Sequence, residues 1–349
     1  MNVTRLPETV QTLLAELFEQ LLAAAARAVP ASGSFVAKKI GGQTYWYLQR
    51  SEGATKRQLY LGPESPALLA SMAKAREERS EADEENRRLA NLVAMLARGG
   101  AFAESAALVK VLSLLAEARV FGLGGVLVGT PAFAAYGNLL GVRFADATLR
   151  TQDVDAQDPV VAVALAGDAE PIDIGATLKS TVPPFLPIPG LDPRRPSTSF
   201  SVGKEMRVDF LTPMRGRESE EPVYLPLFKV AAQPLRLLDY LVENAVQTVI
   251  FDRRHPVLVQ IPDPARFAWH KLWVAQKREV AFQNKARKDL QQAGQLLELL
   301  LEDRPDDLVV AWRALASDPH AAARILRSLR QLPELLPRLE ELLGEKLRP

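Results

Sequence analysis

The chain has 349 residues, nearly half of them apolar, and a formal net charge of +1. This length allows about two to three domains with buried cores, and the near-neutral charge excludes a molecule that attracts nucleic acid over its whole surface. The chain has no cysteine and only three histidines, which excludes disulfides and zinc–thiolate sites and argues against a multi-histidine metal site. We find no signal peptide and no apolar run of about 18 residues, so we expect a cytoplasmic protein without a membrane span.

The N-terminal part is predicted to contain two helices. Residues 8–29 are amphipathic and rich in Ala and Leu, and Pro30 ends this segment. Residues 66–98 carry closely spaced charges of both signs, which is typical of a solvated connector helix, and Gly99 and Gly100 end it.

Residues 33–62 between these helices are rich in β-formers, and we expect a small three-stranded antiparallel module. Its strands are 34–40, 45–50 and 57–61, with Gly41-Gly42 as a hairpin signal. Bases can stack on aromatic side chains while cations meet phosphates, so this module is a candidate nucleic-acid surface. The alternative is a small sheet that docks with its aromatics inward. The candidate residues are Lys38, Lys39, Tyr45, Trp46 and Arg57.

Residues 121–155 form the most informative stretch. After an expected helix at 101–118, an apolar run ends at Gly129-Thr130, residues 131–140 are helix-like, and Thr151-Gln-Asp-Val-Asp155 follows. Side chains two residues apart on a strand share one face, so Asp153 and Asp155 would lie about 6.5–7 Å apart at Cα. Carboxylates held this close favour a bound cation, and Mg²⁺ with one or two carboxylates and substrate phosphate fits them. The pattern indicates phosphoryl or nucleotidyl transfer.

A third carboxylate lies downstream. Residues 160–166 predict a strand, and the proline-rich residues 180–200 predict an irregular loop that faces substrate or covers the sheet. Residues 204–212 alternate apolar and polar side chains, which predicts a half-buried strand that carries Asp209. Asp209 either joins the acidic pair or is simply solvated.

The remainder is predicted to be mostly helical. A helix at 235–244 and a strand at 256–262 precede helices that run from Pro264 almost to the end. In one continuous helix Lys271, Arg278 and Lys285 are seven residues apart and Asp289 is four further on, so they project from one side. This basic stripe either holds triphosphate oxygens or lies on a solvated surface.

Two other nucleotide sites can be excluded. Gly124 to Gly129 has the spacing of a P-loop, but Thr130 stands where the phosphate-binding lysine is required. The dinucleotide-binding pattern GxGxxG is absent as well.

Two segments together resemble a bacterial nucleotidyltransferase family, in particular its abortive-infection, toxin-type branch. LVGTPAFAAYGNLLGVRF followed by TQDVD is similar to the family's glycine turn, helix and DxD strand, and FAWHKLWVAQKR followed by KARKDLQQA is similar to its later helices. The resemblance spans roughly residues 120–300. The chain departs from it in the long interval between Thr130 and Asp153, and in the lack of a second Asp after Asp289.

The resemblance implies a mixed sheet flanked by helices and a helical C-terminal domain. With the small N-terminal antiparallel β module, we expect an α+β fold and divide the chain into residues 1–98 with the N-terminal helix, the β module and the connector helix, a nucleotidyltransferase core at 99–230, and the helical C-terminal domain at 231–349. It implies Mg²⁺, as one or two ions, with an NTP such as ATP as substrate, and tRNA, another RNA or a protein as acceptor, with an antitoxin as a further partner. The implied roles are metal binding and catalysis for Asp153, Asp155 and Asp209, and nucleotide binding for Gly129, Thr130, Lys271, Arg278 and Asp289.

Two alternatives from other classes stay open. The chain can be a catalytically inactive nucleotidyltransferase scaffold that binds nucleotide or RNA. It can also be a structural partner that assembles through its C-terminal helices.

Overall fold

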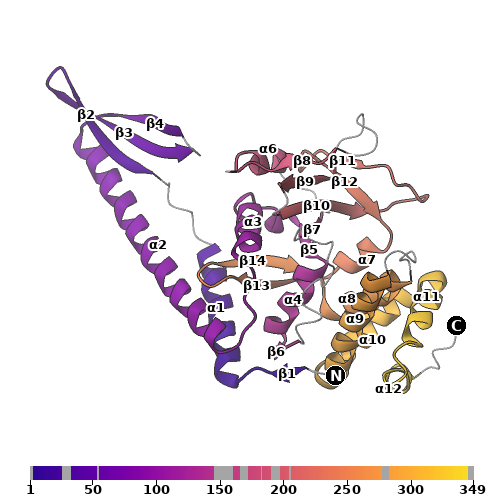
Figure 1. The fold of residues 1–349 in the computed structure, drawn as a ribbon. Coiled ribbons are helices and arrows are strands. Elements are labelled where there is room, and N and C mark those ends of the chain that lie inside the picture. Colours follow the sequence, from indigo (N-terminus) through magenta and orange to yellow (C-terminus); the bar gives the residue numbers. More distant parts are fainter. Residues whose placement is uncertain are drawn as a thin grey trace.

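The structure is a computed structural model, and it describes residues 3–25, 33–52, 55–144, 160–165, 172–181, 183–189, 197–203, 206–276 and 283–344. It has an α+β fold in which a mixed sheet is flanked by helices, as the sequence predicts (Figure 1). Among the described residues, no helix combines the length and apolar character that crossing a bilayer requires.

The two N-terminal helices run in opposite directions beside the main body (Figure 1). Helix α1 (Glu8–Ala25) packs on the C-terminal half of the long helix α2 (Pro66–Arg98). The hydroxyl of Ser65 caps α2 by accepting a bond from the N–H of Leu68, and Pro66 is the first helical residue. The helix ends at Arg98, before Gly99, so both predicted ends of α2 are confirmed. Near the start of the chain, β1 (Thr4–Arg5) pairs with β6 (Val142–Arg143).

The predicted three-stranded antiparallel module is present at the far end of α2 (Figure 1). We call this module the arm sheet. Its strands are β2 (Ser34–Ile40), β3 (Gln43–Glu52) and β4 (Thr55–Pro63) in the order β2-β3-β4.

The main sheet is mixed in strand direction and runs in the order β11-β12-β10-β7-β5. Strand β10 pairs in parallel with both β7 and β12, whereas β5 is antiparallel to β7, and β9 is antiparallel to the first half of β10. The strands are β5 (Val126–Val128), β7 (Val160–Ala164), β8 (Leu186–Pro187), β9 (Ser199–Val202), β10 (Met206–Pro213), β11 (Val223–Leu225) and β12 (Val230–Leu235).

The predicted irregular loop at 180–200 is partly wrong. Its end forms β9, which pairs with β10, and β8 pairs with β9. Alternation is weak in such short segments, and the prolines of this region favoured a loop. The pairing partner that makes β9 a strand lies on another element and is visible only in the fold.

Helices and a hairpin cover this sheet. The hairpin β13 (Val246–Phe251) and β14 (Pro256–Ile261) packs beside β5 and α3, and the sequence had predicted only its second strand. The remaining elements of this part are α3 (Ala106–Glu117), the 3-10 turn η1 (Phe121–Leu123), α4 (Thr130–Leu139), α6 (Ile174–Lys179) and α7 (Leu238–Val242).

The predicted C-terminal helical region is present, but the single long helix from Pro264 is wrong. It is two helices, α8 (Pro264–Ala275) and α9 (Gln283–Asp303), which pack against each other. The sequence of residues 276–282 contains no proline or glycine that would mark a break. Three further helices follow: α10 (Pro305–Ala316), α11 (Pro319–Leu329) and α12 (Leu336–Leu343).

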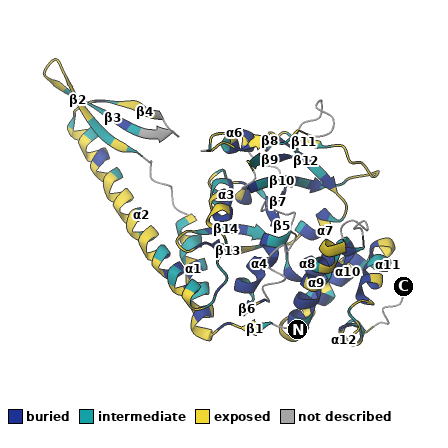
Figure 2. Ribbon diagram, viewed as in Figure 1, coloured by how far each residue is buried: buried dark blue, intermediate teal, exposed yellow. Residues whose placement is uncertain are grey.

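Two buried clusters stabilise the described residues (Figure 2). The larger one runs from α3 through the main sheet into α8–α12, and the indole pair Trp269–Trp312, with ring centroids 4.9 Å apart, lies within it. The smaller one joins α1 and the second half of α2 to Val249 and Phe251 of β13. The arm sheet belongs to neither cluster.

Candidate active site

The third predicted carboxylate lies on β10, in the centre of the main sheet. Met206, Val208 and Phe210 are buried in the core, so strand alternation places Arg207 and Asp209 on the opposite face. The side chain of Asp209 is 23% exposed. The predicted half-buried strand is confirmed, and its acidic residue reaches solvent.

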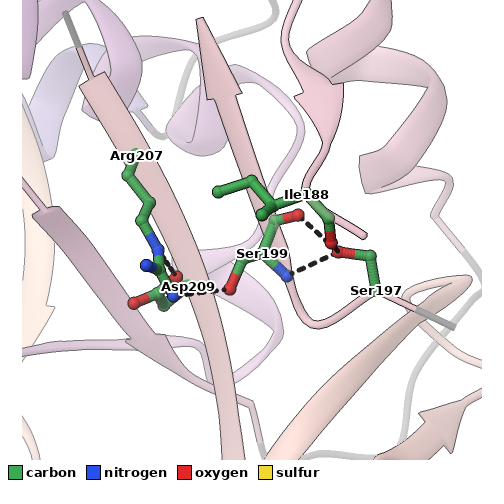
Figure 3. Close-up of polar contacts among 5 residues, drawn as sticks. All are labelled: Ile188, Ser197, Ser199, Arg207 and Asp209. Carbon is green, nitrogen blue, oxygen red and sulfur yellow. Dashed lines mark hydrogen bonds and ion pairs between the residues drawn. The ribbon is translucent and has the colours of Figure 1, made fainter. Parts of the chain in front are cut away.

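Asp209 has a cationic neighbour that the sequence reasoning missed. Arg207 donates from Nε to Asp209 Oδ1 at 2.6 Å and from Nη2 to the hydroxyl of Ser199 at 3.1 Å (Figure 3). The guanidinium is 42% exposed, and ion pairs this open contribute about 0–1 kcal/mol. An incoming cation can therefore displace Arg207 at small cost. The RVD spacing on a predicted strand was the signal that could have found this pair.

Ser199 is itself held in place by the chain around it. Ser197 Oγ lies 2.6 Å from the carbonyl oxygens of both Ile188 and Ser199, and it accepts a bond from the N–H of Ser199 at 3.1 Å (Figure 3). One hydroxyl hydrogen can serve only one of the two carbonyls at a time. This contact fixes the entry into β9, and with it the hydroxyl that meets Arg207.

The Gly129-Thr130 turn joins β5 to α4. All three residues of β5 are buried, and Gly129 then has φ +79° and ψ −152°, a conformation that other residues rarely adopt. Among the described residues, none would lie within 4 Å of a Cβ at Gly129, so this face is open to them. No side chain of the described part of the chain caps the N-terminus of α4. An uncapped helix start after an open glycine is suited to a phosphate.

Strand register brings this turn and Asp209 to one row of the sheet. Val128 pairs with Ala162, Ala162 with Asp209, and Asp209 with Ser199. Strands lie about 4.8 Å apart, so Val128 and Asp209 are separated by roughly 10 Å across the sheet. The end of β5 thus lies level with the middle of β10, with β7 between them, although about 80 residues separate them in the sequence.

Asp153, Asp155 and Arg278 lie outside the described residues. The described chain resumes at Val160, which pairs with Arg207. Within the ranges that the structure describes, no group of three or more His, Asp or Glu side chains could hold a metal ion. Asp209 does fit one as a single ligand, because Oδ2 has no hydrogen-bond partner among the described residues and is open to a hard cation.

Lys271 and Asp289 form a buried ion pair. Lys271 Nζ on α8 lies 2.5 Å from Asp289 Oδ1 on α9, and the side chains are 11% and 4% exposed. The predicted stripe on one face of one helix is therefore wrong, because 18 residues of continuous helix would separate these groups by about 27 Å. The two helices face each other, and the ion pair lies between them.

The start of α8 is fixed against α4. The hydroxyl of Tyr136 donates to the carbonyl of Pro262 at 2.8 Å, and the rings of Tyr136 and Phe133 pack on Phe267. Lys271 Nζ lies 5.2 Å from the centroid of the Phe267 ring. Through these contacts, the helix that begins at the glycine turn has a fixed position relative to the Lys271–Asp289 pair.

The candidate nucleic-acid residues lie elsewhere. Lys38, Lys39, Tyr45, Trp46 and Arg57 are on the arm sheet, at the far end of α2 from the main body (Figure 1). The fold does not bring them next to Asp209.

The described residues thus place an acidic strand and a glycine turn that opens a helix on one mixed sheet, with a helical C-terminal part. A family described as Nucleotidyltransferase matches residues 106–317, more than half of the chain. The chain belongs to this nucleotidyltransferase family. No curated protein and no solved structure matches the chain.

Proposed function

We propose that this protein transfers a nucleoside monophosphate from an NTP to an acceptor hydroxyl and releases pyrophosphate. The observation that carries the proposal is the row Val128–Ala162–Asp209, which sets the glycine turn about 10 Å from an accessible carboxylate in a member of a nucleotidyltransferase family. In the proposed reaction the acceptor oxygen bonds to the α-phosphorus as the bond to the α,β-bridging oxygen breaks. The acceptor proton passes to a carboxylate or to water.

Asp153 and Asp155 complete the proposed carboxylate set with Asp209. In the sequence, Asp155 precedes Val160, the residue that pairs with Arg207, by five residues. We propose that the three side chains hold one or two Mg²⁺ ions. Bound Mg²⁺ supplies charge neutralisation for the triphosphate and polarises the attacked phosphoryl group.

The turn and the C-terminal helices are proposed to hold the triphosphate. Backbone N–H groups at Gly129 and the hydroxyl of Thr130 would donate to phosphate oxygens, assisted by the positive end of α4. Lys271 and Arg278 would supply cations from the C-terminal side. Because Lys271 is buried against Asp289, we propose that Asp289 orients it and limits how far it can reach.

The test is label transfer. Protein is incubated with Mg²⁺, α-labelled NTPs and total tRNA or cell lysate, and we expect label on one acceptor class. Asp209→Asn should reduce transfer by at least 100-fold without unfolding the protein, because the carboxylate is solvent-accessible and its ion pair is weak. Asp83→Asn, at an exposed carboxylate on α2, is the matched control. Equal transfer by both variants contradicts the proposal.

The alternative function is a scaffold that binds nucleotide or RNA without turnover. The observation in its favour is Arg207, whose guanidinium occupies Asp209 Oδ1. Isothermal titration with an NTP separates the two. Heat of binding without any product, in the wild type and in Asp209→Asn alike, favours the scaffold.

The resemblance to toxin-type enzymes adds a narrower proposal, a growth-arresting activity held in check by an antitoxin. Induced expression of the wild type should then stop growth, whereas Asp209→Asn should be tolerated at equal protein level. Unimpaired growth with active enzyme in the cell contradicts this role and leaves nucleotidyl transfer untouched.

A further inference from the structure

We infer that the outer face of the arm sheet binds single-stranded RNA by stacking its bases on tyrosines. The proposed transfer reaction enters only as the reason to choose RNA, the acceptor class that this surface fits. Binding itself requires neither NTP nor metal.

The two faces of the arm sheet differ in what covers them. Phe35 pairs with Leu48, so both side chains lie on one face, and Arg76 of α2 lies 5.5 Å from the Phe35 ring centroid. Arg79 of α2 also donates to the carbonyl of Gly33. Leu48 is buried on this side. The α2 side of the sheet is therefore its inner face.

The outer face carries a cluster of tyrosines. Tyr47 pairs with Tyr60 across β3 and β4, with ring centroids 5.4 Å apart, and Tyr45 lies 6.2 Å from Tyr60. Tyr60 is 53% exposed. Three rings on one open sheet face are more aromatic surface than a solvated sheet needs. Aromatic rings on an exposed sheet are platforms on which unpaired bases stack.

Polar groups and a cation surround these rings. Lys38 Nζ lies 4.6 Å from the centroid of Tyr47 and donates to Gln58 Oε1 at 2.6 Å, and Gln58 donates to Gln49 at 2.8 Å. This ladder holds the Lys38 ammonium over the Tyr47 ring, where it can meet a phosphate while Tyr60 stays exposed for a base.

Charge favours a nucleic acid over a protein partner or a second copy of the chain. Residues 33–63 contain five basic residues and one acidic residue, Glu52, whereas the whole chain has a net charge of only +1. A local positive field is the electrostatic mark of a phosphate-backbone ligand. The excess belongs to the arm sheet as a whole, so two copies of the arm sheet would repel each other.

The fold separates the predicted nucleic-acid residues between the two faces of the arm sheet. By strand alternation Lys39 and Trp46 fall on the α2 side with Phe35 and Leu48, and Trp46 donates its indole N–H to Glu64 at 3.1 Å. Lys38 and Tyr45 fall on the outer face with Tyr47 and Tyr60. We therefore assign base stacking to the tyrosines and not to Trp46.

The test is fluorescence anisotropy of a labelled 15-nucleotide single-stranded RNA with the full-length protein, without NTP or divalent cation. We expect Tyr60→Ala to weaken binding about 5- to 150-fold and Tyr60→Phe to preserve it, because stacking on one base contributes about 1–3 kcal/mol. Tyr224→Ala is the matched control, since Tyr224 is 54% exposed on β11 of the main sheet. A hairpin duplex of the same length should bind more weakly.

Further variants define the outcome. Lys38→Gln should lower the slope of log affinity against log salt by about 0.7, the value for one phosphate contact on a single strand. Asp209→Asn should bind RNA like the wild type, so failure of the transfer reaction and failure of this inference are separable. Equal RNA affinity of Tyr60→Ala and wild type overturns the inference, as does a self-association that Tyr60→Ala abolishes while RNA binding is absent.

Discussion

Gly129 shows how a single residue can set the geometry of the candidate site. With φ +79° and ψ −152° it turns the chain from a buried strand directly into α4 and leaves its own face open. A side chain here would find space but would strain the backbone. Asp209 and Arg207, roughly 10 Å away across the sheet, are by contrast held only loosely.

Gly129→Ala should therefore act through the backbone. We expect a loss of about 1–3 kcal/mol in the free energy of unfolding, and weaker NTP binding, because the turn shifts toward negative φ. Urea unfolding and isothermal titration measure the two effects. Gly122→Ala is the control, because Gly122 also has open space but no positive φ, and it should change stability little.

His270 gives the structure a pH dependence. Burial and the neighbouring Lys271 cation lower the pKa of His270 from 6.5 to about 3. Between these values the unfolded chain binds a proton that the folded chain does not, so the free energy of unfolding falls as the pH decreases below about 6.5. It is unaffected by His270 above that pH.

His270→Gln should reduce this decrease of the unfolding free energy below about pH 6.5. Between pH 7.5 and pH 5.0 the wild type should lose at most about 2 kcal/mol more of its unfolding free energy than the variant, because the ring keeps partial solvent contact. Denaturant unfolding at the two pH values measures the difference. Parallel losses in both proteins would show that the imidazole is protonated in the folded state.

At the scale of elements, the α8–α9 pair determines the shape of the C-terminal part. Its helices meet through Lys271 and Asp289, and α8 is joined to α4 through Tyr136 and Pro262. The pair thus lies between the helix that starts at the glycine turn and the C-terminal bundle. An ion pair in this position can be structural, functional or both.

Single and double variants of the pair separate these roles. Lys271→Met or Asp289→Leu alone should destabilise by about 3–5 kcal/mol, because each breaks a buried ion pair by removing one of its two charges. The double variant should recover most of that loss. If it refolds and still transfers no label, Lys271 also acts on phosphate; if it is fully active, the pair serves only packing. Thermal unfolding and the transfer assay provide the readouts.

At the scale of the whole molecule, contacts join residues that are far apart in the sequence. Arg5 pairs with Asp303 at 2.5 Å, β1 pairs with β6, and one buried cluster runs from α3 to α12. The arm sheet lies outside both clusters, at the end of a long helix whose first half is largely exposed (Figure 2). The division into units at 98/99 and 230/231 stays a proposal.

Replacing residues 33–63 by a short Gly-Ser linker tests this independence. The melting temperature of the main body should change by no more than a few degrees, because none of the described residues of the arm sheet contributes to either core. RNA affinity should be lost and NTP affinity retained. A collapse of the melting temperature would mean that the arm sheet supports the body.

The sequence by itself determined the local elements of this protein. The apolar–polar alternation of 206–210, the ends of α2 at Pro66 and Gly99, and the strands of the arm sheet follow from side-chain period and turn chemistry, which neighbouring residues carry. The Gly129-Thr130 turn and Asp209 were found in the same way.

Only the tertiary structure decided what those elements face. The pairing that makes β9 a strand and the meeting of Lys271 with Asp289 across two helices both depend on partners distant in sequence. The same holds for the arm sheet. The face that carries Tyr45, Tyr47 and Tyr60 is its outer face because α2 covers the other side. Side-chain period defines two faces of a strand, but packing decides which one is left open to a ligand.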